Sequence, residues 1–275
     1  MSNKQETIQL ASTSKTLLHD EQRFYDLRWQ QSEIPARELR RVVATVQAIP
    51  AECKRILDVG AGDGRIWEQI RARGLQVTAL DLSLVALARL SVPSCCGSAD
   101  RLPFGDAAFD LVLSTEMLEH VPSSIYPRVL SELARVAGRY VLVTVPNREN
   151  LTEQQAKCGA CGRTFHIWGH ARAYTRAKVN QLFPGFQAIR ISEIGDSLDG
   201  YNRLLLWVRQ KLGGGFAWDA STYCYHCTAS VPCSPRSKFL LKICDGLNLC
   251  FWAPFNRRPS WLLVLYRRNT LPIAK

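Results

Sequence analysis

The chain has 275 residues, of which 47% are hydrophobic and 21% charged, and a formal net charge of +11. Its length fits one large domain, or one domain with a substantial insertion, and no internal repeat or low-complexity segment occurs. The first residues are polar, with no apolar signal-peptide core, and no run of eighteen uncharged apolar residues is present. We therefore expect a cytoplasmic protein without a membrane-spanning helix.

Strands and helices are predicted to alternate along the chain. The predicted strands are residues 55–59, 75–80, 94–100, 109–117, 139–147, 186–194 and 259–268. The predicted helices are residues 36–49, a segment from 65 onward, a segment near 83–90, 124–137 and 177–183. This alternation indicates an α/β fold with a mostly parallel sheet and helices on both faces. The last two strands have no short turn between them, so we expect a final pair interrupted by an insertion.

The expected organisation has four parts. They are an N-terminal arm or lid (1–35) whose first twenty residues are expected to be mobile, a core sheet domain (36–195), a cysteine-containing insertion with an amphipathic helix (196–258), and a last strand with a basic tail (259–275). The arm contains Phe24, Tyr25 and Trp29, which either close over the site as a lid or pack in the core, and also His19.

The most informative stretch is "ILDVGAGDG", residues 56–64, where a strand runs into Gly60, Gly62 and Gly64. Glycines at a strand end let the chain turn sharply and let a ligand approach the backbone. Asp81 closes the next strand 21 residues after Gly60, the place where a carboxylate binds ribose hydroxyls. The pattern indicates a nucleoside-binding site at the carboxyl ends of these strands.

These residues resemble the class I S-adenosylmethionine (SAM)-dependent methyltransferases. Three further segments are similar in order and spacing, namely "ALDLS", "GSADRLPFGDAAFDLVLSTEMLEHVP" and "ELARVAGRYVLVTVPN". The resemblance covers about residues 50–195 and is to the ubiquinone-biosynthesis-like, type 11 methyltransferase domain. It implies a doubly wound, Rossmann-like sheet and SAM as methyl donor; the cysteines considered below add the expectation of a small zinc-bound insertion before the last strand.

The resemblance also implies a SAM site. Its expected residues are Asp58 at the amino group, Gly60, Ala61 and Gly62 along the methionyl part, Asp81 at the ribose, Leu82, Ala99, Asp100 and Arg101 around the adenine, and Ser114 at the end of the fourth strand. A hydroxyl acceptor must lose its proton, and histidine does this near neutral pH. The candidate catalytic bases are His120, His166 and His170, although His120 could instead hold its loop and His170 could only line the acceptor pocket.

Two C-x2-C pairs indicate a metal rather than disulfides, because no secretion signal is seen. Cys158, Cys161, Cys224 and Cys227 would form one closed structural zinc site per chain if the two pairs meet in space. A compact alternative is Cys158 and Cys161 with His166 and His170. Cys233 is a substitute ligand.

The basic charge is concentrated near the end of the chain. Residues 236–275 hold eight basic side chains and one acidic one, a net charge of +7 that favours an anionic partner. The apolar segment 238–258, with basic ends, either lies on a membrane surface or packs on the sheet.

We therefore predict a methyltransferase acting on a small-molecule or sugar- or lipid-linked acceptor, at oxygen. The alternatives are an RNA methyltransferase, which the basic tail favours although no RNA-binding module is seen, and a non-catalytic zinc-stabilised binding protein. No oligomeric state is predicted.

Overall fold

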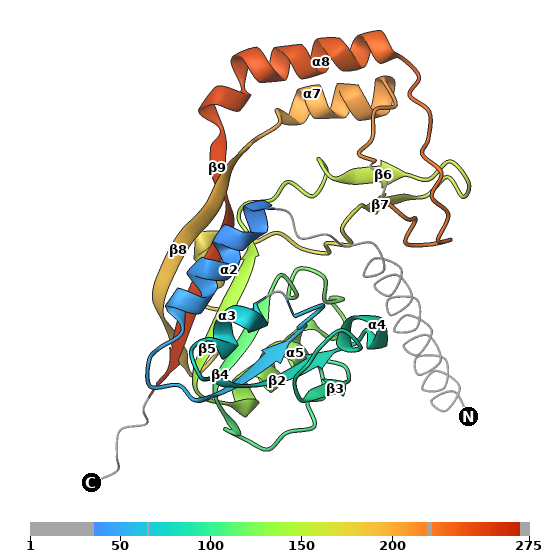
Figure 1. Ribbon diagram of the computed structural model, residues 1–275. Coiled ribbons are helices and arrows are strands. Elements are labelled where there is room, and N and C mark those ends of the chain that lie inside the picture. The colour runs from blue at the N-terminus through green and yellow to red at the C-terminus, as the bar shows by residue number, and fades with distance from the viewer. Residues whose placement is uncertain (1–35, 65, 219–221, 270–275) are drawn as a thin grey trace, which may run out of the picture.

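The computed structural model describes residues 36–64, 66–218 and 222–269, and a seven-stranded sheet forms the centre of this part of the chain (Figure 1). Its strands are β1 (Arg55–Val59), β2 (Gln76–Asp81), β3 (Ser94–Cys96), β4 (Phe109–Thr115), β5 (Ala137–Pro146), β8 (Phe186–Asp199) and β9 (Arg257–Arg268). They lie in the order β3-β2-β1-β4-β5-β9-β8. Strands β1 to β5 are parallel and β9 runs antiparallel to both neighbours, so the predicted mostly parallel α/β sheet is confirmed.

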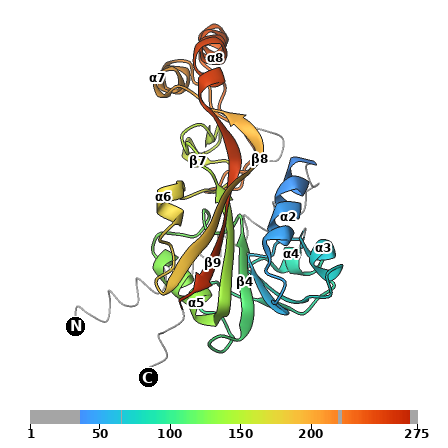
Figure 2. The ribbon, with the colours of Figure 1, turned by 90° about the vertical axis from the view of Figure 1, so that its left-hand side faces the viewer.

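Helices cover both faces of the sheet (Figure 2). One face carries α2 (Ala36–Ala48), α3 (Trp67–Arg71) and α4 (Leu84–Leu87), and the other carries α5 (Tyr126–Val136) and α6 (Arg176–Val179). Strand residues alternate between the two layers: Leu111 and Leu113 of β4 pack under α2 and α3, whereas Val112 packs under α5. The core thus has two apolar layers, as expected for a parallel sheet buried on both sides.

Strands β8 and β9 are longer than the others and extend beyond the rest of the sheet (Figures 1 and 2). Strand β8 continues past the predicted end at residue 194 because it stays paired with β9 as far as Asp199 and Arg257. At the far end of this ribbon lie α7 (Arg203–Trp207), its π-helical continuation η1 (Val208–Leu212), α8 (Lys238–Phe251) and the short 3-10 turn η2 (Ala253–Phe255).

Helix α8 packs against α7 and η1, and not on the sheet. Of the two alternatives for segment 238–258, packing on the sheet is therefore wrong, because the long β8–β9 ribbon holds the segment away from the sheet. A small hairpin of β6 (Gln155–Lys157) and β7 (Thr164–His166), which the hydrophobic pattern did not indicate, lies between this tip and the sheet.

Two further expectations concern the N-terminal lid and the absence of a membrane-spanning helix. The predicted lid at residues 1–35, with His19, Phe24, Tyr25 and Trp29, lies outside the described residues. Among the described residues, no helix is both long and apolar enough to cross a membrane.

Candidate active site

The glycine loop after β1 has the backbone shape that the sequence predicted. Gly60, Gly62 and Gly64 have φ angles of +76°, +56° and +76°, a region that residues with a Cβ rarely adopt. A Cβ at Gly60 would lie 2.4 Å from Cγ of Met117, which follows β4. Gly60 is therefore required twice, for its backbone conformation and for the close approach of the loop after β4.

Asp58 lies beneath this loop and is 1% exposed. Its Oδ2 accepts a hydrogen bond from Nε1 of Trp67 at 2.9 Å, while its Oδ1 has no partner among the described residues. Burial raises the pKa of Asp58 to about 7. A buried carboxyl with an unsatisfied oxygen fits a cationic ligand group such as the α-ammonium of SAM.

Asp81 ends β2 next to the glycine loop. Its Oδ2 accepts from the backbone N–H of Gly62 at 2.8 Å and its Oδ1 from that of Ser83 at 2.8 Å. These two bonds fix the carboxylate at the end of β2, and a carboxylate oxygen can accept more than one hydrogen bond, as binding of a ribose hydroxyl requires. Ala61 and Leu82, also predicted to contact SAM, are half-buried beside it.

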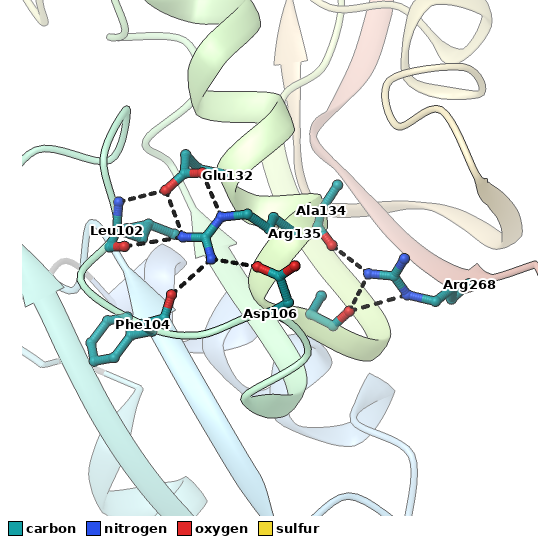
Figure 3. A network of polar contacts seen from close by, with 8 residues as sticks. Leu102, Phe104, Asp106, Glu132, Ala134, Arg135 and Arg268 are labelled. Carbon is teal, nitrogen blue, oxygen red and sulfur yellow. Dashed lines mark hydrogen bonds and ion pairs between the residues drawn. The ribbon is translucent and has the colours of Figure 1, made fainter.

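The predicted adenine residues lie on the loop after β3. Asp100 is 7% exposed and accepts from Oγ of Ser98 at 2.6 Å and from the Arg128 guanidinium at 3.0 Å, whereas Arg101 is exposed and Ala99 half-buried. This loop is anchored to α5 through the guanidinium of Arg135 (Figure 3). Its contacts are the carboxylates of Glu132 and Asp106 and the carbonyls of Leu102 and Phe104, at 2.7 to 3.1 Å.

Two further buried hydroxyls lie at the carboxyl ends of the central strands. Oγ of Ser114 on β4, a predicted site residue, and Oγ1 of Thr144 on β5 have no hydrogen-bond partner among the described residues. Both side chains are fully buried, so a ligand hydroxyl or a water molecule is the natural partner.

Three histidines and two glutamates gather beyond this edge, and we call them the Glu–His cluster (Glu119, His120, Glu149, His166 and His170). Oε2 of Glu149 lies 2.6 Å from Nδ1 of His170, and its Oε1 lies 3.4 Å from Nε2 of His166. Burial alone would raise the pKa of Glu149, but the hydrogen bonds from both histidines lower it to about 2. The ring of His170 stacks on that of His166 and meets the ring of His120 edge-on, with centroids 4.6 and 4.7 Å apart.

The two ring nitrogens of His166 face different neighbours, Nδ1 two backbone N–H groups and Nε2 the carboxylate of Glu149. Its Nδ1 accepts the backbone N–H groups of Trp168 and His170, both at 3.2 Å, so its proton lies on Nε2 and faces Glu149. The role of His166 as a candidate base stays a prediction. His120 and His170 keep the geometry of acid–base or ligand groups.

Two buried acids precede His120. Oε2 of Glu116 accepts from Nε1 of Trp261 on β9 at 2.5 Å, and burial raises the pKa of Glu116 to about 7. Glu119 is fully buried, neither of its carboxyl oxygens has a partner among the described residues, and burial raises its pKa well above the usual range.

The four cysteines of the C-x2-C pairs meet, as the sequence predicted. Sγ of Cys158 lies 3.7 Å from Sγ of Cys227, Sγ of Cys161 lies 3.6 Å from Sγ of Cys224, and all four sulfurs lie within 4.8 Å of one another. Zn–S bonds of about 2.3 Å place the sulfurs of a tetrahedral site about 3.8 Å apart, whereas a disulfide bond is about 2.05 Å long.

The compact alternative, with His166 and His170 as zinc ligands, is not formed, because both histidines bind Glu149 instead. Cys233 is not part of the four-sulfur group either. The backbone N–H of Cys233 donates to the carbonyl of Lys157, so it supports the hairpin with its main chain.

Comparisons with known proteins agree with this geometry. Residues 57–140 match the family described as a methyltransferase domain. The malonyl-[acyl-carrier protein] O-methyltransferase of Erwinia pyrifoliae is 36% identical over 124 residues, which are 42% of this chain and 47% of that protein. The ubiquinone biosynthesis O-methyltransferase of Chromobacterium violaceum is 34% identical over 118 residues, which are 39% of this chain and 50% of that protein. The chain thus spans half or less of the length of these relatives.

A putative methyltransferase from Bacillus halodurans shares the fold, with a TM-score of 0.51 and 15% identity over 83% of this chain and 99% of that protein. The resemblance inferred from the glycine loop is thereby confirmed for the sheet and for residues 57–140.

Several residues of the site were missed from the sequence. Glu149 in "PNREN" follows β5 directly, and an acid at a strand end is a signal that could have found it. Trp261 and Arg135 gave no such signal, because their partners lie 145 residues and up to 33 residues away in the chain.

Proposed function

We propose that this chain is a SAM-dependent methyltransferase that methylates a hydroxyl oxygen. The observation that carries the proposal is the contact of Met117 with Gly60. It brings the cofactor loop, with its unsatisfied Asp58, against the β4 loop that leads into Glu119 and His120. A methyl donor and a proton-accepting group are then on neighbouring loops, as in-line transfer requires.

SAM, when bound, supplies a methyl group on a sulfonium. In the proposed mechanism Asp58 receives the ammonium group on its unsatisfied Oδ1, and Asp81 receives the ribose hydroxyls. The glycine loop and the loop after β4 exclude water from the methyl carbon. The acceptor hydroxyl gives its one proton to a base beside Glu119, His120 and His170, either an imidazole or a water molecule, while its oxygen forms the new C–O bond and the C–S electron pair stays on sulfur.

We propose that the four cysteines hold one structural zinc. The donor set fits, since soft thiolates select zinc and a closed site of four thiolates leaves no position for substrate. Strand β7 runs from this site to His166, so the metal would fix the hairpin that carries His166 and leads to His170. It would shape the acceptor side of the site without taking part in the chemistry.

We further propose that the acceptor is linked to a lipid and is reached from an anionic membrane. The elements α7, η1, α8 and η2, whose exposed residues we call the α7–α8 surface, expose large apolar side chains by 52 to 82%. They are Leu204, Trp207, Leu212, Phe239, Leu249, Phe251 and Phe255. Scattered apolar residues are ordinary on a surface, but seven on these four neighbouring elements favour an interaction site.

Basic residues accompany this apolar surface. Arg203, Lys211, Arg236, Lys238 and Lys242 are all exposed, and residues 203–251 contain six basic and two acidic side chains, a net charge of +4. Apolar side chains flanked by lysine and arginine fit the interface of an anionic bilayer. A second copy of the chain carries the same positive charge, which opposes pairing through this surface.

Vesicle binding tests the proposed contact with an anionic membrane. Co-sedimentation should show binding to phosphatidylglycerol-containing vesicles and weak binding to pure phosphatidylcholine. The triple variant Phe239→Ser, Phe251→Ser and Phe255→Ser should lose about tenfold or more in affinity. The matched control Ile189→Ser, at an exposed apolar residue of β8, should bind as the wild type does. The membrane proposal would be contradicted if the triple variant bound vesicles as tightly as the wild type. It would also be contradicted if the wild-type chain bound no vesicles and eluted as a dimer.

Incubation with methyl-labelled SAM and host extract tests the activity and the acceptor together. After separation into small-molecule, lipid, glycan and RNA pools, label should enter the lipid pool. Label in the RNA pool would instead support the RNA methyltransferase alternative. That alternative is weakened by the structure, since Arg268 donates to the carbonyls of Ala134 and Ala137, and Arg257 pairs with Asp199. No label in any pool would favour a non-catalytic binding protein.

A further inference from the structure

We infer that Glu119, His120 and His170 bind a divalent first-row transition cation, separate from the four-cysteine site. The binding itself is independent of the proposed function, and only the use of the cation, to activate the acceptor hydroxyl, rests on it. One donor atom from each of the three side chains lies within 4.8 Å of the other two. A cation bonded at about 2.1 Å to each needs adjacent donors roughly 3 Å apart, which small side-chain rotations supply.

The hydrogen bond of His170 to Glu149 orients it as a ligand. With Nδ1 donating to Oε2 of Glu149 at 2.6 Å, the lone pair of His170 lies on Nε2. A carboxylate that fixes the far nitrogen of a histidine is the usual outer support of a metal ligand, because it sets the tautomer and raises basicity. The other oxygen of Glu149 lies near Nε2 of His166, the last residue of β7, so β7 helps to hold Glu149 in place.

Glu119 gives a second, independent observation. Its side chain is fully buried and neither carboxyl oxygen has a hydrogen-bond partner among the described residues. A buried carboxylate without a partner is strongly unfavourable, and a cation bound by Glu119 and two imidazoles would satisfy it. The backbone is already held in place for this, since the carbonyl of Glu119 accepts from the N–H of Ala171 at 2.7 Å.

The donor set indicates the class of cation. Two imidazoles and one carboxylate suit manganese, iron, cobalt or zinc in the divalent state, and three protein ligands leave positions open. An acceptor hydroxyl at an open position would release its proton to water more readily. Its oxygen would then bond to the methyl carbon, the C–S electron pair would stay on sulfur, and the cation would keep its charge.

Mn²⁺ is the probe that separates this site from the cysteine site, because hard Mn²⁺ prefers carboxylate and imidazole to thiolate. Titration of the zinc-containing full chain with Mn²⁺, followed by the electron paramagnetic resonance signal of the free ion, should show one bound Mn²⁺ per chain. Glu119→Gln and His170→Gln should abolish that binding. Glu149→Gln, which removes only the outer support, should weaken it by about 10- to 100-fold. The control Glu193→Gln, at an exposed glutamate of β8, should bind as the wild type does.

The possible outcomes distinguish failure of the cation site from failure of the proposed methyltransferase function. Unchanged zinc content and SAM binding in the Glu119 and His170 variants would show that they are folded. The inference is overturned if the wild type leaves the free Mn²⁺ signal undiminished, or if Glu119→Gln binds the ion equally well. Bound Mn²⁺ with no SAM binding would instead keep the cation site and remove the proposed function.

Discussion

Cys224→Ser should remove the zinc and most of the methyl transfer while leaving SAM binding intact. The thiolate of Cys224 is fully buried, in a small apolar cluster with Phe165 and Ile167, so its loss leaves three thiolates and loosens the β6–β7 hairpin. His166 then no longer fixes Glu149 and His170, and a displacement of about 1 Å at such groups lowers turnover by about 100-fold. The proposed SAM residues lie on β1, β2, β4 and the loops after β1, β2 and β3, outside the β6–β7 hairpin, and should be unaffected.

Elemental analysis, calorimetry with SAM and turnover measure these three effects separately. The matched control is Cys233→Ser, the same chemical change at a cysteine whose sulfur lies outside the four-sulfur group. That control should keep zinc, SAM affinity and turnover. A Cys224→Ser chain that retains one zinc and full turnover would contradict the four-cysteine site.

Asp58→Asn should weaken SAM binding by about 10- to 100-fold, the usual range for a hydrogen bond to a charged group. In the wild type, SAM affinity should rise as the pH increases through about 7, because burial holds the pKa of the cofactor-free Asp58 there and the ammonium binds the ionised form. The variant should show no such rise. Calorimetry at a series of pH values between 6 and 8 measures both effects.

The same substitution should have the opposite effect on stability. Because the pKa of Asp58 is raised on folding, its stabilising contribution is present below its ordinary pKa and is lost as the pH rises toward about 7. Without SAM, Asp58→Asn should therefore unfold at a higher temperature than the wild type at pH 8.

The matched control is Asp110→Asn at the other end of the sheet. Hydrogen bonds from the backbone N–H groups of Arg55 and Lys54 lower the pKa of Asp110, so its contribution to stability is present at neutral pH and is lost in acid. Asp110→Asn should destabilise the chain at pH 8 and leave SAM affinity unchanged. A SAM affinity that is equal in wild type and Asp58→Asn would remove Asp58 from the site.

Local patterns in the sequence were sufficient for the sheet and the cofactor loop. The strand 55–59, its glycines and Asp81 are neighbours in the chain, and their chemistry depends on local turns and strand ends. The meeting of the cysteine pairs was predictable for a similar reason, since two C-x2-C knuckles share one tetrahedral geometry.

Long-range contacts account for what the sequence did not predict. Helix α8 is apolar enough to pack on a sheet, and only the length of the β8–β9 ribbon moves it away. From the sequence, the histidines of "FHIWGH" could be zinc ligands or could face the acceptor. In the structure His170 bonds to Glu149, 21 residues earlier in the chain, which favours the acceptor side. Neither the ribbon length nor that pairing has a local signal.

Calorimetric titration of the purified chain with SAM tests the central claim most directly. We expect one binding site per chain, tight in the wild type and lost in Gly60→Val, whose Cβ would strike Met117. A wild-type chain that binds no SAM at neutral or mildly alkaline pH, while remaining folded, would contradict the methyltransferase assignment.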